Sequence, residues 1–158
     1  MPLPRSMLRM TDDELESFLT EQRTARIGTI SPNGEPHVVP MWFVWHDGKI
    51  YMNTLKRARR TRDIETGSRV SVCIDAGYEY AELHGAVLYG VFEEVPETAE
   101  IRKKFGEKYW SGIDIPEVKS HRWIVMTPDK VVSWDFKKIP QGGDRRAGAL
   151  EANKREPS

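Results

Sequence analysis

The segment His37–Trp45, with the sequence HVVPMWFVW, places the strongest constraint on how this chain can fold. Successive side chains of a β-strand point to opposite faces. The two faces of this strand carry Val38, Pro40, Trp42 and Val44 on one side, and His37, Val39, Met41, Phe43 and Trp45 on the other. Because both faces are largely apolar, one can fill a core and the other must meet a partner subunit or a flat ligand.

A proline inside this strand predicts a local irregularity. Pro40 has no backbone N–H to donate to a strand ladder, so we expect a bulge or an interruption of pairing at this residue. The neighbouring aromatic residues make such an interruption a place where a ring system could enter.

Further strands are predicted on both sides of this segment, most of them joined by short turns. They are Thr24–Ile30, Ile50–Thr54, Arg69–Asp75, Ala81–Val95, His121–Thr127 and Lys130–Phe136. Asn33-Gly34 is typical of a hairpin turn. Gly85 and Gly90 interrupt the longest strand, as expected where a strand coils around a closed barrel. Six or seven strands with hairpin connections favour a small antiparallel barrel.

Two helices are also predicted, one before the first strand and one after Ala81–Val95. Thr11 and Glu14 form a capping box ahead of a helix from Asp12 to about Gln22. A second helix over Pro96–Trp110 carries Ile101, Phe105 and Tyr109 at helical spacing. The predicted fold class is therefore mainly β within α+β, an antiparallel barrel with two or three flanking helices. We expect the apolar outer face of His37–Trp45 to be buried in a homodimer.

Length and charge limit the domain organisation and the classes of partner. We expect an arm over residues 1–10, one folded domain over 11–137, and a polar, poorly ordered tail over 138–158. Lys+Arg 24 balances Asp+Glu 24, which argues against a general nucleic-acid or membrane-surface binder. The single cysteine, the absence of a membrane-spanning apolar run and the lack of a signal-peptide core predict a cytoplasmic protein.

The segment Tyr51–Ile64 concentrates positive charge where a strand runs into a helix. Its cations are Lys56, Arg57, Arg59, Arg60 and Arg62. The start of a helix directs free N–H groups and a positive dipole end at its surroundings. Together with the polar side chains of Asn53 and Thr54, this arrangement is typical of a phosphate site. Taken alone, the segment fits a solvated basic helix face equally well.

Other catalytic patterns are missing from the sequence. The four histidines, His37, His46, His84 and His121, lack metal-ligand spacing, and neither nucleophile motifs nor a P-loop or dinucleotide fingerprint occur. Glu82 and His84 could form an acid–base pair, although a surface contact is the favoured interpretation. We predict no metal and no protein-borne nucleophile, so that any catalysis depends on a bound cofactor.

In this order and spacing, the residues resemble the split-barrel flavin and deazaflavin oxidoreductases, the superfamily of pyridoxamine 5′-phosphate oxidase. They are most similar to the branch that binds the deazaflavin coenzyme F-420. The resemblance extends from about Asp12 to about Phe136. It rests on ARIGTISPNGEPHVVPMWFVW (residues 25–45), Arg59-Arg60-Thr61-Arg62-Asp63-Ile64, Arg69-Val-Ser-Val, Asp75-Ala-Gly-Tyr-Glu-Tyr80, Gly85 and Val-Val-Ser-Trp-Asp-Phe136.

The resemblance implies a homodimer with two cofactor sites at the subunit interface. It implies phosphate clamps at Arg59 and Arg60 with Lys56 close by, polar contacts from Asn53 and Thr54, a ring-lining set of His37, Val38, Pro40 and Trp42, and partner-chain residues Tyr78 and Tyr80 over the ring or the substrate. Arg60 departs from the lysine usual in relatives, which keeps the charge but supplies a planar fork. Gly67-Ser68 replaces the Asn-Pro that often precedes the next strand, a change expected to affect only a turn.

Five neighbouring cations fit F-420, with its phosphodiester and polyglutamate tail, better than flavin mononucleotide (FMN), which remains the alternative cofactor. The predicted function is hydride transfer from reduced F-420 to an electron-poor small molecule, with Tyr78, Tyr80 or water as the proton source. The alternatives are an FMN-dependent enzyme resembling pyridoxamine-phosphate oxidase and a non-catalytic flavin or deazaflavin carrier. A protein whose basic segment contacts RNA is a third hypothesis, which the neutral net charge disfavours.

Overall fold

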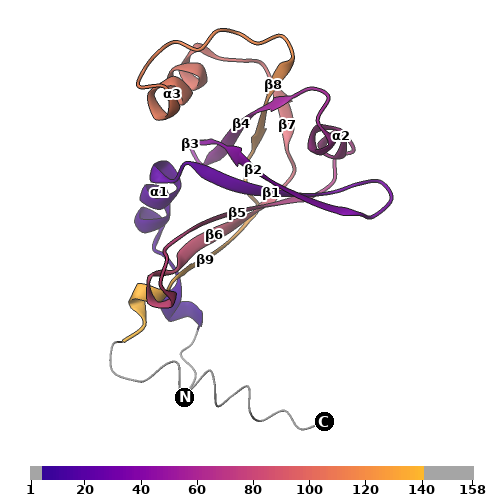
Figure 1. Cartoon of the computed structure of the whole chain (residues 1–158). Coiled ribbons are helices and arrows are strands. Elements are labelled where there is room, and N and C mark those ends of the chain that lie inside the picture. The colour runs from indigo at the N-terminus through magenta and orange to yellow at the C-terminus, as the bar shows by residue number, and fades with distance from the viewer. Residues whose placement is uncertain (1–4, 141–158) are drawn as a thin grey trace.

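Two antiparallel sheets form the body of the chain, shown in Figure 1. The computed structural model describes residues 5–140. The strands are β1 (Thr24–Ile30), β2 (Pro36–Trp42), β3 (Val44–His46), β4 (Lys49–Leu55), β5 (Val70–Ala76), β6 (His84–Gly90), β7 (Glu93–Val95), β8 (His121–Met126) and β9 (Lys130–Asp135). Five strands pair in the order β2-β1-β5-β6-β9, and four pair in the order β3-β4-β8-β7. The predicted α+β fold with an antiparallel split barrel is confirmed.

Three α-helices and three short 3-10 helices complete the described chain. They are α1 (Asp12–Glu21), α2 (Arg59–Glu65) and α3 (Ala99–Tyr109), with 3-10 helices at Arg5–Leu8, Tyr80–Glu82 and Phe136–Lys138. The predicted capping box begins α1: Glu14 N donates to Thr11 Oγ1 at 3.2 Å, and Thr11 N donates to Glu14 Oε2 at 2.7 Å. Both long predicted helices are therefore present, each within a few residues of its expected ends.

Nine strands replace the six or seven predicted because two of the predicted strands divide where the chain passes from one sheet to the other. The first division falls at Phe43, between β2 and β3, and the second at Val91-Phe92, between β6 and β7. Each crossing buries a phenylalanine in the core. Gly90 ends β6 at the second crossing, where an added Cβ would lie 2.9 Å from Met126 Cγ. A larger residue at position 90 would displace Met126 from the core.

The interruption of pairing expected at Pro40 is not observed. Pro40 lies opposite Arg26 within an unbroken ladder that runs from Thr24↔Trp42 to Ile30↔Pro36. Because β2 is the edge strand of its sheet, it needs ladder bonds on one side only and tolerates a proline. The break instead comes at Phe43, where the chain leaves this sheet.

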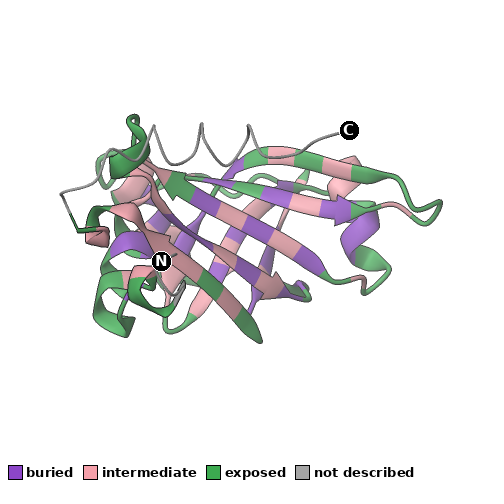
Figure 2. Cartoon of the chain, turned by 90° about the horizontal axis from the view of Figure 1, so that it is seen from below, coloured by how far each residue is buried: buried purple, intermediate pink, exposed green. Residues whose placement is uncertain are grey.

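The core lies between the two sheets, and burial alternates along the strands, as Figure 2 shows for the described residues. The predicted inward face of β5, comprising Val70, Val72 and Ile74, is buried. A second cluster forms where α3 packs against β3 and β8; its buried members are Val44, Ile101, Phe105 and Trp123. The apolar positions predicted on the second helix therefore do face the protein interior.

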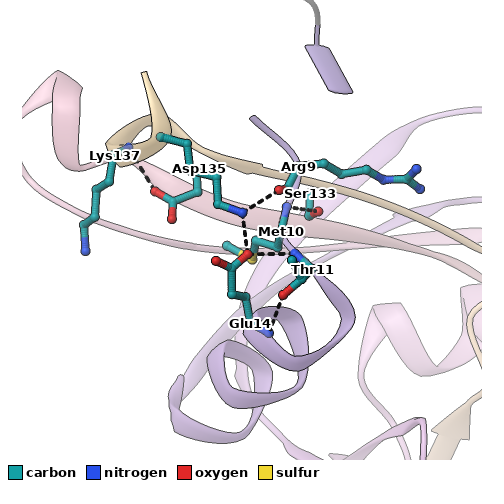
Figure 3. Close-up of polar contacts among 8 residues, drawn as sticks. Arg9, Met10, Thr11, Glu14, Ser133, Asp135 and Lys137 are labelled. Atoms are coloured by element: carbon teal, nitrogen blue, oxygen red, sulfur yellow. Dashed lines mark hydrogen bonds and ion pairs between the residues drawn. The ribbon is translucent and has the colours of Figure 1, made fainter. Parts of the chain in front are cut away.

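The beginning and the end of the described chain are tied together, as seen in Figure 3. Lys138 Nζ donates to the main-chain oxygen of Arg9 at 2.7 Å and forms an ion pair with Glu14. Met10 is buried, and its N–H donates to Ser133 Oγ at 3.1 Å. Packed structure therefore continues on both sides of the predicted domain 11–137.

Much of the predicted tail and the first part of the predicted arm lie outside the described residues, which begin at residue 5 and end at residue 140. Within that range, no helix is long and apolar enough to cross a membrane.

Candidate functional site

Helix α2, which carries most of the basic segment, is docked onto the sheet by a buried polar contact. Asp63 is buried, and its Oδ2 accepts a hydrogen bond from Thr29 Oγ1 of β1 at 2.8 Å. The N-cap residue, Ala58, has no side chain able to accept from the first turn. Asp63 and Thr29 were not identified from the sequence, because an aspartate within a charged segment looks like a surface residue.

Arg60 is held by a hydroxyl chain that starts on β4. Its Nε donates to Thr54 Oγ1 at 3.0 Å, and Thr54 is fully buried. Thr61 donates its only hydroxyl proton to the main-chain oxygen of Leu55 at 2.8 Å. Thr54 must then donate to Thr61 Oγ1, 3.1 Å away, which leaves a lone pair for Arg60. Thr54 therefore orients Arg60 and has no proton free for a ligand.

The guanidinium of Arg60 has no carboxylate partner among residues 5–140. Partial burial of this group lowers its pKa, because desolvation disfavours the charged form. A cation that is partly removed from water and unpaired by its own chain favours an anion at its free end.

Arg59 is held by the β1–β2 turn. Its Nε and Nη2 donate to Ser31 Oγ at 3.2 and 2.9 Å, and its Nη2 also lies 3.0 Å from Glu35 Oε2. A cavity of about 480 Å³ separates this turn from α2 and is lined in part by Ser31, Arg59 and Arg62. An anion approaching Arg59 would therefore compete with Glu35.

Lys56 and Asn53 lie together, but at a different cavity. Both line a space of about 570 Å³ that is bounded on its other side by α3 and the residues that follow it. The backbone N–H of Lys56 donates to the main-chain oxygen of Ser120 at 2.9 Å. Of the predicted phosphate residues, Arg59 thus lines one of these cavities, Asn53 and Lys56 line the other, and Arg60 and Thr54 line neither.

The outer face of β2 is apolar and exposed, as its sequence required. Val38 is 65% exposed, Trp42 is 44% exposed, and Pro40 between them is also exposed. His37 is half-buried and pairs with Thr29 in the β1–β2 ladder. Trp42 already stacks on Tyr109, with ring centroids 4.4 Å apart and planes inclined by 11°. Val38 and Pro40 therefore offer free apolar surface on this face, which Ile30, 52% exposed, extends to the β1–β2 turn.

Tyr78 and Tyr80 are not brought to the arginines within one chain. They follow β5, whereas α2 precedes it, and the seven residues of β5 separate the two places by roughly 20 Å. Figure 1 shows the β5–β6 connection at the opposite end of the sheet from α2. The two side chains are 92% and 63% exposed. Any contact between them and a ligand held at α2 would require a second subunit.

A group of titratable residues near the far end of β2 was not anticipated. Lys108 Nζ lies 4.2 Å from the ring centroid of Phe43, and burial, aided by the charge of Arg23, lowers the pKa of Lys108 to about 8. Burial raises the pKa of Tyr109 to about 12. The Tyr109 hydroxyl accepts from Phe43 N at 2.9 Å, so this side chain joins α3 to the crossing between the sheets. Its position on the apolar helix stripe was the only sequence signal.

The possible acid–base pair of Glu82 and His84 does not form through side chains. His84 Nδ1 lies 2.7 Å from the main-chain oxygen of Glu82. Within the described range there is no group of three or more His, Cys, Asp or Glu side chains placed to hold a metal ion.

The two sheets with their crossings at Phe43 and Val91-Phe92, and the cluster of arginines at the start of α2, define the class of split-barrel proteins. The family model of pyridoxamine 5′-phosphate oxidase matches residues 11–135, and the chain belongs to this family. The superfamily predicted from the sequence is therefore confirmed. No curated protein matches the sequence.

Solved structures with the same fold include proteins described in different ways. A conserved hypothetical protein of Mycobacterium tuberculosis is 24% identical, with a TM-score of 0.75 over 90% of this chain and 99% of that one. An F-420 reductase is 20% identical, with a TM-score of 0.63 over 77% and 98%. The heme storage protein HutZ of Vibrio cholerae is 16% identical, with a TM-score of 0.65 over 78% and 94%. These likenesses concern the fold.

Proposed function

We propose that this chain is an oxidoreductase that binds coenzyme F-420 and uses the reduced coenzyme to transfer a hydride to an electron-poor small molecule. Membership of the pyridoxamine 5′-phosphate oxidase family supports a flavin-type cofactor. The observation that carries the proposal is Arg60, a partly buried guanidinium oriented by Thr54 and unpaired by any carboxylate of the described chain. Such a group suits the phosphate of a cofactor.

The residues around Arg60 fit the remaining parts of the cofactor. Arg59, held by Ser31, supplies a second guanidinium. Val38 and Pro40 on the outer face of β2 supply apolar surface for a flat ring. The bound coenzyme would supply the hydride, while the chain holds the phosphate, supports the ring and limits access of water to it. Tyr78 or Tyr80 of a second subunit, or water, would supply a proton to the substrate.

The number of cations in the basic segment that have no carboxylate partner favours F-420 over FMN. Arg57 and Arg62 form no ion pair with residues 5–140, and neither does Lys56. With Arg60, four of the five cations of the segment are left without a carboxylate. FMN carries one phosphate monoester, whereas F-420 carries a phosphodiester and a polyglutamate tail that can use cations beyond the phosphate site.

Binding of the two cofactors to wild type and to single variants tests this proposal. Arg59→Ala and Arg60→Ala should each weaken F-420 binding by about 1–3 kcal/mol, the range of charge-assisted hydrogen bonds. Arg57→Ala and Arg62→Ala should weaken F-420 binding by less and leave FMN binding unchanged. Arg69→Ala is a suitable control, because Arg69 is not one of the five cations of the segment and is already paired with Asp129. Quenching of tryptophan fluorescence reports binding, and the melting temperature checks folding.

The outcomes separate the alternatives. Tight FMN binding without quenching by F-420 would assign the chain to the FMN-dependent enzymes. Tight F-420 binding, with no oxidation of the reduced coenzyme in the presence of enones, quinones or nitro compounds, would indicate a carrier. Unchanged binding of both cofactors by Arg59→Ala and Arg60→Ala would leave the segment as a solvated helix face.

A further inference from the structure

The cavity beside Lys56 has the size and walls of a small-molecule site. Its volume is about 570 Å³, within the usual range for pockets that hold organic ligands. It lies between α3, the ends of β4 and β8, and the chain from Trp110 to Ser120, called here the 110–120 segment. Neither the basic helix α2 nor the exposed face of β2 forms its walls.

Three aromatic rings form the apolar wall of this cavity. The centroid of the Phe105 ring lies 5.3 Å from the ring centroid of Trp123, in an edge-to-face arrangement, and 5.6 Å from that of Trp110. Trp123 donates its indole N–H to Glu97 Oε2 at 2.9 Å, so its polar atom is satisfied. Trp123 and Phe105 are each only 4% exposed and close the floor of the cavity, whereas Trp110 is 39% exposed and offers its ring to a ligand. Ile115, from the 110–120 segment, adds an aliphatic side chain to the lining. These walls suit a flat, apolar body.

On the side of the cavity formed by β4, the polar side chains of the lining lack a hydrogen-bond or ion-pair partner among residues 5–140. Two of the carboxylates, Glu94 and Glu97, are paired with Arg122 and Arg102. The side chains of Lys56 and Asn53 form no hydrogen bond or ion pair with the described residues. The remaining acidic residues of the lining, Asp114 and Glu117, are exposed on the 110–120 segment. An anionic group would therefore find partners left unpaired by the described chain at Lys56 and Asn53 on the β4 side of the cavity and at Lys119 on the 110–120 segment.

The 110–120 segment is anchored at both ends, which keeps the cavity open. Gly112 N donates to the main-chain oxygen of Gly106 at 3.0 Å, and a Cβ at position 106 would lie 2.7 Å from the main-chain oxygen of Ile113. Only glycine allows so close an approach to α3. At the other end, Ser120 accepts the backbone N–H of Lys56 at 2.9 Å. The walls are therefore held by backbone contacts that do not depend on a ligand.

We infer that this cavity binds a flat aromatic acid, with its rings against Phe105, Trp110 and Trp123 and its carboxylate at Lys56 and Asn53. The inference goes beyond the cofactor proposal, since it concerns a second ligand and a different apolar wall; Lys56 is the residue that the two proposals share.

Titration calorimetry of the full chain with 2-naphthoate, 2-naphthalenemethanol and 2-naphthylmethylamine tests the inference. We expect 2-naphthoate to bind most tightly of the three. Lys56→Gln should weaken 2-naphthoate binding about tenfold, as expected for loss of a charge-assisted contact, and leave the neutral alcohol unchanged. Ile115→Trp should abolish binding of both by filling the cavity. Val132→Trp, an exposed position on the outer face of the five-stranded sheet, is its control.

Lys56 is exposed, so Lys56→Gln tests the inference even where Ile115→Trp fails to fold. Absence of 2-naphthoate binding, binding no weaker in Lys56→Gln, or tighter binding of the amine would each overturn it. Because the probe is titrated without flavin or deazaflavin, such a result would leave the cofactor-binding test untouched.

Discussion

Two adjacent arginines at the start of α2 are held by different neighbours, and this difference decides what each can do. Arg60 is fixed through its Nε alone, whereas Arg59 binds Ser31 and also pairs with Glu35. An incoming anion meets an unpaired guanidinium at Arg60 but must displace a carboxylate at Arg59. Glu35 therefore acts as a competitor for the ligand within the chain.

Replacing Glu35 should tighten cofactor binding. Glu35→Gln removes the negative charge and keeps the shape, so the affinity should rise by up to about fivefold, matching the about 0.2–1 kcal/mol typical of an exposed ion pair. Titration of wild type and variant with F-420 and with FMN measures the change. Added salt should reduce the difference, because it screens exposed charges.

Glu93→Gln provides the matched control, since Glu93 is exposed on β7 and forms no ion pair within residues 5–140. If Glu35→Gln binds no more tightly than wild type, Glu35 does not compete with the ligand, and Arg59 has another role.

Residue type and spacing predict Arg59, Arg60 and Thr54 as site residues, because a cluster of cations after a strand can be recognised in the sequence. The contacts of these residues were not visible. Ser31 and Glu35 lie about 25 residues before the arginines and meet them only because β1 and α2 are docked together. A hydroxyl that orients a neighbouring arginine has the same sequence pattern as one that contacts a ligand.

Among the elements, the two sheet crossings show that hydrophobic patterning predicts where strands lie but not to which sheet each part belongs. The alternation of His37–Trp45 continues through Phe43 into β3, so the sequence predicts one strand where two sheets each receive a part. A period of two residues shows only which side chains point toward the core and which point away from it. These directions are kept when the chain passes from one sheet to the other around the same core. The predicted number of strands is therefore too low, although every predicted strand segment is present.

Helix α3 carries a buried lysine whose titration should appear in the pH dependence of stability. The pKa of Lys108 is lowered to about 8 from an ordinary value of 10.5, so the folded chain binds fewer protons than the unfolded chain between these values. The free energy of unfolding therefore rises with pH from about 8 to about 10.5. Lys108→Met should remove this rise and stabilise the protein at pH 7 by about 1 kcal/mol, after allowance for solvent screening.

Urea unfolding of wild type and Lys108→Met between pH 7 and pH 9.5 measures the effect. This window lies below pH 10, where the raised pKa of Tyr109, about 12, begins to make stability fall as pH rises. Lys103→Met is the control, because Lys103 is exposed on the same helix. Equal pH slopes in wild type and Lys108→Met would show that Lys108 titrates as an exposed lysine.

On the scale of the whole molecule, one chain supplies only part of the predicted cofactor site. The arginines of α2 lie near one end of the five-stranded sheet and Tyr78 and Tyr80 near the other, while the apolar face of β2 runs between the two ends. The outer face of β2 is uncovered within the described chain, with Val38 and Trp42 both exposed. We therefore expect a homodimer in which this face is buried and each site combines α2 of one subunit with the tyrosines of its partner.

Subunit complementation tests this arrangement directly. Arg60→Ala in one chain and the double change Tyr78→Ala, Tyr80→Ala in another should each weaken cofactor binding in their own homodimers. In a mixed dimer, one site receives both defects, and the other receives an intact Arg60 and intact tyrosines. Differently tagged, co-expressed chains should therefore regain wild-type affinity at one site per dimer, measured by titration against protein concentration. If each site were built from a single chain, every site in the mixed dimer would carry a defect and no affinity would return. Light scattering that shows a monomer would rule out a shared site before any binding is measured.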